Sequence, residues 1–108
     1  MEENRRSLIK DLVLNSIADD YEDFRIILDE VTHWGSQRGV QLTRNEIETA
    51  LRDLLSAGHA QAYELSTLPP HSTPVVVAAE RIRASYYYLT PAGRDILRNL
   101  VELGFELE

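Results

Sequence analysis

Four arginines have side chains suited to binding a charged partner: Arg44, Arg52, Arg81 and Arg83. The planar guanidinium group can hydrogen-bond a phosphate, or the edge of a guanine base, through two N–H groups at once. Asn45 and Thr49 lie between the first two arginines, and their side chains can hydrogen-bond to base edges. Together these residues indicate a surface that contacts duplex DNA.

The same segment supports a simpler interpretation, because it carries the acidic residue Glu48. Residues four positions apart are neighbours on a helix, so Glu48 could pair with Arg44 and with Arg52 on a solvated face. A carboxylate at this place would also repel phosphates. The residues alone leave both interpretations open, and Glu48 belongs to the candidate contact set.

Residues that usually support catalysis or metal binding form no recognisable pattern. The histidines His33, His59 and His71 are scattered, without the spacing of a helical metal-ligand pair. The chain has no cysteine, which excludes disulfides and thiolate ligands. No motif frames a serine nucleophile. We therefore predict no enzyme activity, no catalytic residue, no metal site and no cofactor.

The tyrosine run at 86–88 could stack on bases or line a pocket. In a strand, however, alternate side chains point to the same face, so Tyr87 would share a face with Leu89. Leu89 is expected in the core. A core and sheet-surface role for these tyrosines is the simpler expectation.

A helix predicted at about 44–57 positions Arg44, Asn45, Thr49 and Arg52. Thr43 is a candidate N-cap, and Glu46 three residues later completes a capping box. Apolar residues recur at helical spacing along one face: Ile47, Ala50, Leu51, Leu54 and Leu55. Gly58 stands where a left-handed C-cap is expected.

Before this helix, the apolar spacing predicts helices at 5–18 and 21–34, with one bent helix over 5–34 as the alternative. The acidic run 19–23 lacks the pattern of a metal loop and is interpreted as a cap with an acidic first turn. Residues 35–39 are expected to form a turn, and Val40 and Leu42 a very short strand.

After Gly58 the period changes to alternation, which predicts strands at 59–67 and 82–89. Three prolines place 68–74 in a loop, so the two strands form a hairpin with a long wing at about 67–81. Thr90 and Pro91 then start a last helix at about 91–105, as N-cap and first helical residue. The expected fold is α+β, mostly α: a winged helix-turn-helix in one domain over 1–108.

The chain resembles the PadR-like and MarR-like regulators at two places. Residues 42–59 resemble the recognition helix and strand entry of those proteins, and Tyr87-Tyr88-Leu89-Thr90-Pro91-Ala92-Gly93-Arg94 resembles the junction that closes their wing. The resemblance covers about residues 20–100. It implies a dimeric transcription factor whose helix at 44–57 enters the major groove while the wing follows the backbone.

The overall charge limits these expectations. The chain of 108 residues has a net charge of -7 and is 44% hydrophobic. The negative charge argues against a protein that coats nucleic acid nonspecifically.

The apolar run Val75–Ala79 is too short to span a bilayer, so a cytoplasmic protein is expected. Apolar stripes on the first and last helices predict a homodimer. The acidic balance and the apolar wing tip also suit an alternative, a protein-contact module without DNA binding.

Overall fold

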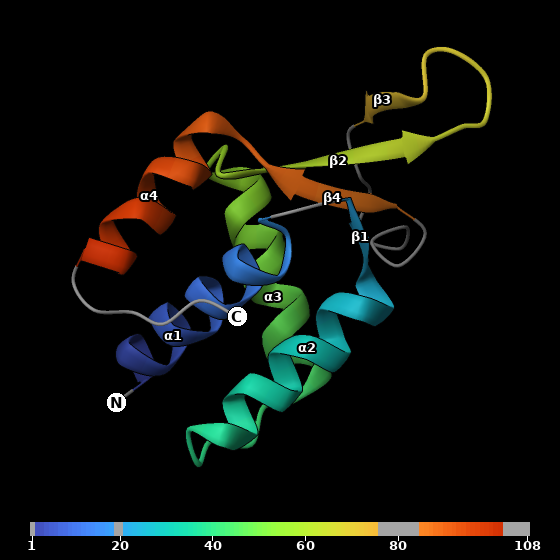
Figure 1. Ribbon diagram of the computed structural model, residues 1–108. Coiled ribbons are helices and arrows are strands. Elements are labelled where there is room, and N and C mark those ends of the chain that lie inside the picture. Colours follow the sequence, from blue (N-terminus) through green and yellow to red (C-terminus); the bar gives the residue numbers. More distant parts are fainter. Residues whose placement is uncertain (1, 19–20, 76–84, 103–108) are drawn as a thin grey trace.

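The computed structural model describes residues 2–18, 21–75 and 85–102 of the chain. The elements follow in the order α1 (Glu2–Ser16), β1 (Glu22–Asp23), α2 (Phe24–Gln37), α3 (Arg44–Ser56), β2 (Ala60–Leu65), β3 (Ser72–Val75), β4 (Tyr86–Leu89) and α4 (Pro91–Glu102). Helices α1, α2 and α3 pack together, and the sheet extends away from them (Figure 1). The predicted α+β, mostly helical architecture is confirmed.

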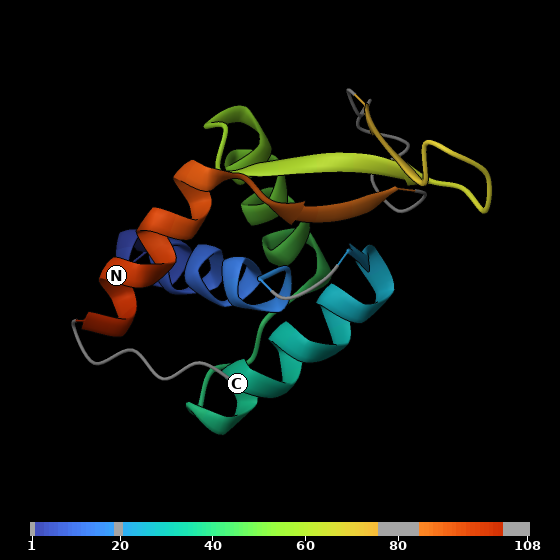
Figure 2. The ribbon, with the colours of Figure 1, turned by 45° about the horizontal axis from the view of Figure 1, so that its top comes forward.

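Helix α1 is the centre of the helical core, as Figure 2 shows. It packs against both α2 and α3, and every residue from Leu12 to Ala18 is buried. The C-terminal half of α1 is therefore covered on all sides, as in a core helix, whereas Arg6 and Ser7 near its N-terminal end are exposed. The apolar stripe predicted on this helix is covered by the chain itself except at Leu8, which is partly exposed.

Helix α2 begins three residues later than predicted. Asp23 is its N-cap, and the Asp23 carboxylate accepts a hydrogen bond of 2.9 Å from the Ile26 N–H. The prediction of a cap in the acidic run is confirmed, but α2 has no acidic residue in its first turn. Glu22 and Asp23 form β1, paired with Tyr87 and Tyr86. This strand rules out one bent helix over 5–34.

The turn predicted at 35–39 is shorter than expected, because α2 continues through Gln37. Gly35 lies inside the helix where α2 meets the following segment. A Cβ at this position would lie 2.9 Å from Leu42 Cδ1 and 3.1 Å from the Val40 carbonyl oxygen. The absence of a side chain at Gly35 therefore lets residues 40–42 pack closely against α2, and the glycine does not form the predicted turn. Residues 40–43 are not a strand, which corrects the prediction for Val40 and Leu42.

The sheet is antiparallel with the order β1–β4–β2–β3. The β2–β4 pair matches the two predicted strands, and β1 and β3 widen the sheet on either side. Pro74 lies within β3, opposite Tyr63, so the prediction of a loop throughout 68–74 is wrong. Proline fits here because β3 is an edge strand, where a missing N–H interrupts no ladder. As predicted, Tyr87 and Leu89 both point into the core.

The junction between β4 and α4 is a compact hydrogen-bonded joint. The Thr90 hydroxyl accepts from the Gly93 N–H at 3.1 Å and donates to the Gly58 carbonyl at 2.6 Å. The Thr90 N–H donates to the His59 carbonyl at 3.2 Å. The predicted N-cap is confirmed, and so is the left-handed residue Gly58, with φ of 77°. The predicted helix end at 103–105 lies outside the described residues.

No described helix combines the length and apolar character needed to cross a membrane.

Candidate nucleic-acid interface

Helix α3 separates a buried face from an exposed polar face, as its residue spacing predicts. Ile47, Ala50, Leu51 and Leu54 are buried. The exposed residues predicted to contact DNA are Arg44, Asn45, Thr49 and Arg52. We call these four residues the α3 face. The helix therefore presents two guanidinium groups, a carboxamide and a hydroxyl to solvent on one element.

The N-terminal end of α3 is fixed by a capping box. The Glu46 N–H donates to the Thr43 hydroxyl at 3.2 Å, and the Thr43 N–H donates back to the Glu46 carboxylate at 3.0 Å. Arg5 of α1 joins this cap: it donates to both Glu46 oxygens, at 2.5 and 3.1 Å, and to the Gln41 carbonyl at 2.5 Å. The Arg5 hydrogen bonds, followed by those of Thr43, lower the pKa of Glu46 to about 2. Glu46 thus joins α1 to the start of α3.

Glu48 does not extend outward with the α3 face. Its side chain is only 15% exposed and lies 3.6 Å from Arg52, which confirms that predicted ion pair. Burial, and to a smaller extent the charge of Glu48, raise the pKa of Tyr87, whereas a hydrogen bond from Ser85 opposes them. Glu48 therefore lies on the flank of α3 that turns toward the sheet.

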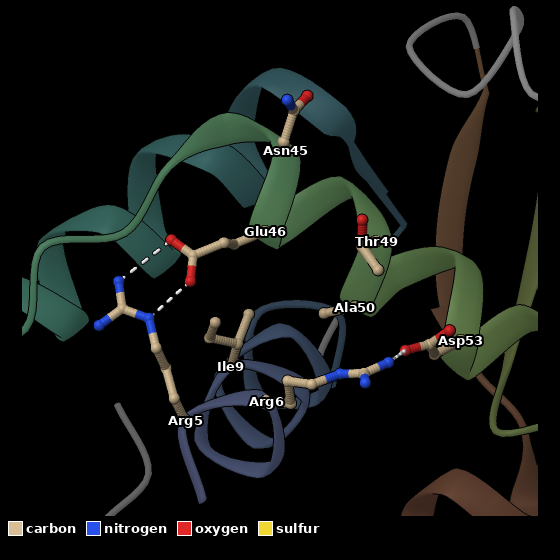
Figure 3. A pocket seen from close by; sticks show the side chains of 8 residues that line it. All are labelled: Arg5, Arg6, Ile9, Asn45, Glu46, Thr49, Ala50 and Asp53. Atoms are coloured by element: carbon tan, nitrogen blue, oxygen red, sulfur yellow. Dashed lines mark hydrogen bonds and ion pairs between the residues drawn. The ribbon is translucent and has the colours of Figure 1, made fainter. Parts of the chain in front are cut away.

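A cleft of about 480 Å³ separates the first turns of α1 from α3. Its residues are labelled in Figure 3: Arg5, Arg6, Ile9, Asn45, Glu46, Thr49, Ala50 and Asp53. Arg6 lies 3.6 Å from Asp53 at one end of the cleft, and Arg5 binds Glu46 at the other. The structure thus brings Arg5 and Arg6 to the base-edge candidates Asn45 and Thr49. Sequence spacing missed both arginines.

The other predicted contact residues, Arg81 and Arg83, lie outside the described residues. Three large hydrophobic residues remain exposed at or next to the wing: Leu65 at the end of β2, Leu68 in the β2–β3 loop, and Tyr86 at the start of β4. Tyr21 packs against Tyr63 and Tyr88 on the outer face of the sheet, with ring centroids 5.0 and 5.2 Å apart. The tyrosines thus divide between core and sheet surface.

Within residues 2–18, 21–75 and 85–102, no group of three or more histidine, aspartate or glutamate residues is arranged to hold a metal ion.

The comparisons with known proteins concern the fold. No protein-family model matches the chain, and no curated protein matches it by sequence. A solved structure, the X-ray structure of a PadR-like transcription factor from Bacteroides fragilis, matches with a TM-score of 0.60 and 13% sequence identity. The match covers 94% of this chain and 84% of that chain. The chain has a PadR-like winged-helix fold.

Proposed function

We propose that this protein is a DNA-binding transcriptional regulator in which α3 enters the major groove and the wing follows the DNA backbone. In this proposal Asn45 and Thr49 reach base edges, while Arg44 and Arg52 contact phosphates. Arg81 and Arg83 in the wing would add phosphate contacts. No catalytic residue, metal or cofactor is part of the proposal, and the protein would act in the cytoplasm.

The observation that carries the proposal is the exposure of the α3 face. α3 is a regular capped helix that packs on the core through one side only, so its polar side is available to a partner. An α-helix of this kind fits the major groove of B-DNA. The fold shared with a PadR-like transcription factor supports the same assignment.

The charges of the molecule set the expected strength of binding. The net charge of -7 opposes association with DNA, so random duplex should bind weakly, with a Kd of about 10⁻⁴ M or above at physiological salt. Glu48 forms an ion pair with Arg52, at 3.6 Å. Glu48→Gln removes a like charge near the groove and releases Arg52, so it should strengthen binding.

The test is a titration of a labelled random-sequence duplex at about 50 mM salt, repeated as the salt rises. We expect log Kd to rise linearly with log salt, with a slope of about 0.9 for each phosphate neutralised. Arg52→Ala should weaken binding on all sequences alike, whereas Asn45→Ala should relax preference at one base pair by about 1–3 kcal/mol. No duplex binding by the wild type and by Glu48→Gln would disprove the proposal.

We also propose that the protein is a homodimer. The two helices named in the prediction support it equally: Leu8 of α1 and Ile96 of α4 are both partly exposed where they pack against the core. Among the side chains that the structure describes, neither helix has a large apolar residue that is mostly exposed. The dimer proposal therefore depends on α1 and α4 together. Sedimentation at micromolar concentration should give a mass above the 12.3 kDa of one chain, and a monomer would contradict it.

A second candidate function is a protein contact made by the wing without DNA. Leu65, Leu68 and Tyr86 favour it, because these large exposed hydrophobic residues all belong to the sheet and its β2–β3 loop. Contiguous exposed apolar patches mark association surfaces, and this function would require the three side chains to act together. The duplex titration separates the candidates, since this function requires no salt-dependent DNA binding.

A further inference from the structure

We propose that Arg6 of α1 is a phosphate-binding residue of the DNA interface, held in place before binding by Asp53, whereas Arg5 beside it only positions α3. The inference rests on the proposed function, because it requires α3 to lie in the major groove. It adds a phosphate contact from α1 to the contacts proposed for α3 and the wing, on the side of α3 that faces α1.

The geometry places both arginines beside the residues proposed to read bases. Two consecutive residues of α1 reach two points of α3 that lie about 10 Å apart along its axis, at 1.5 Å per residue. These points are Glu46 and Asp53. Between the two ion pairs the cleft has an apolar floor of Ile9 and Ala50, and Asn45 and Thr49 line it from the α3 side. Figure 3 shows the arginines approaching α3 from the α1 side.

The space around a helix in the major groove explains why a phosphate should meet Arg6. The groove is about 12 Å wide, and a helix with its side chains fills about 10–12 Å. An element that lies against the flank of the recognition helix therefore faces one of the two phosphate backbones. α1 packs across α3, so Arg6, the exposed cation at the N-terminal end of α1, lies over that backbone.

The two arginines differ in how firmly their carboxylate partners hold them. Arg5 is 40% exposed and makes three hydrogen bonds, two to Glu46 and one to the Gln41 carbonyl. Arg6 is 67% exposed, and its one partner among the described residues is Asp53, at 3.6 Å. An exposed pair at this distance contributes little, whereas a phosphate offers charge-assisted hydrogen bonds to the same group. Exchanging a carboxylate for a phosphate is therefore easy at Arg6 and costly at Arg5.

Asp53 has two effects on DNA binding. Its carboxylate keeps Arg6 against α3, and its charge repels the incoming phosphate. Removing the charge but keeping the shape, as in Asp53→Asn, should release Arg6 and tighten the complex.

The chain supplies a matched control pair on α4. Arg98 and Asp95 also lie 3.6 Å apart; Arg98 is 70% exposed, close to the 67% of Arg6, whereas Asp95 is 72% exposed and Asp53 39%. Arg98→Ala and Asp95→Asn change the net charge of the protein by the same amounts as Arg6→Ala and Asp53→Asn. They therefore correct for long-range electrostatics.

The experiment measures the binding of the labelled random-sequence duplex by wild type and variants between about 50 and 200 mM salt. Arg6→Ala should weaken binding about 3–10-fold at the lowest salt and lower the salt slope by about 0.9 per protomer. Asp53→Asn should tighten binding, while both α4 variants should keep the wild-type slope. Arg5→Ala should also keep that slope but lower the melting temperature, because it removes the contact to the α3 cap.

Each result has a distinct meaning. If the wild type binds and Arg6→Ala behaves as Arg98→Ala does, the inference is wrong and the proposed function stands. If neither the wild type nor Glu48→Gln binds the duplex, both fail together. If Arg5→Ala lowers the salt slope as much as Arg6→Ala does, the division of roles between the two arginines is overturned.

Discussion

Replacing Gly93 with alanine should destabilise the protein, although alanine is the better helix former by about 1 kcal/mol. Gly93 lies in the first turn of α4, directly over the end of the segment that leaves α3. An added Cβ would lie 2.0 Å from the His59 carbonyl oxygen and 3.3 Å from Leu89 Cδ2. The nearest atom belongs to the backbone, so it cannot rotate away as a side chain would.

The cost follows from the movement that this contact forces. α4 must shift by about 1 Å to bring the new contact to ordinary distance. That shift breaks two hydrogen bonds of Thr90, to the Gly58 and His59 carbonyls, each with a net contribution of about 1 kcal/mol. Overpacking adds about 1–3 kcal/mol, and helix propensity returns about 1 kcal/mol. The expected loss in the free energy of unfolding is about 2–4 kcal/mol.

Urea unfolding, followed by the fluorescence of the one tryptophan, measures this change. Trp34 is buried in the native protein, so its emission should report the loss of the core. Gly35→Ala is the control with a milder clash: Gly35 is also inside a helix, its nearest neighbour is the movable side-chain atom Leu42 Cδ1 at 2.9 Å, and the nearest backbone atom, the Val40 carbonyl oxygen, lies at 3.1 Å rather than 2.0 Å. It should change stability by less than about 1 kcal/mol. A higher urea midpoint for Gly93→Ala would refute the argument.

Three further predictions test the core and the two helix caps. Leu54→Ala should cost about 2–5 kcal/mol, since the side chain is 2% exposed; an unchanged melting curve would contradict its place in the core. Thr90→Ala should cost about 1 kcal/mol through the lost cap, and hydrogen exchange at residues 92–94 should become faster than in the wild type. The lowered pKa of Glu46, about 2, means that its ionised form stabilises the folded protein above the unfolded pKa, and that this contribution is lost as the pH falls toward 2. The melting temperatures of the wild type and Glu46→Gln should therefore differ at pH 6 and converge toward pH 2.

Features that depend on neighbours in the sequence were predicted well. The cap of Thr43 and Glu46, the left-handed Gly58 and the cap at Thr90 each involve residues within four positions of one another. Turn and cap chemistry of this kind is set locally. The buried and exposed sides of α3 follow from its helical period in the same way.

Features that depend on strand pairing were predicted less well. β1 has two residues, too few for any alternation to show, and only its pairing with β4 makes it a strand. The acidic run contains several aspartates that could cap a helix. Because Glu22 and Asp23 pair with β4, the helix begins only after them, and Asp23 is its N-cap. Pro74 argued against a strand, but it lies on an edge of the sheet that the sequence does not reveal.

The sequence predicted the candidate residues that share one helix but not those that come from another helix. The α3 face lies on one helix, so its members share a period. Arg5, in contrast, is 41 residues from Glu46, and no local pattern connects such distant positions. Only the packing of α1 against α3 reveals that the first helix brings two cations to α3.

The joint at Thr90 has a mechanical consequence. One residue separates β4 from α4, and its hydroxyl and N–H both bind the backbone at Gly58 and His59, where α3 ends. These hydrogen bonds tie the start of α4 to the C-terminal end of α3, so we expect a tilt of α4 to strain that end of α3. In the proposed dimer, the angle between the two subunits would set the distance between the two copies of α3. That distance must match the 34–36 Å helical repeat of DNA or a multiple of it, so a ligand or substitution that bends this joint would change DNA binding without touching the DNA-facing residues.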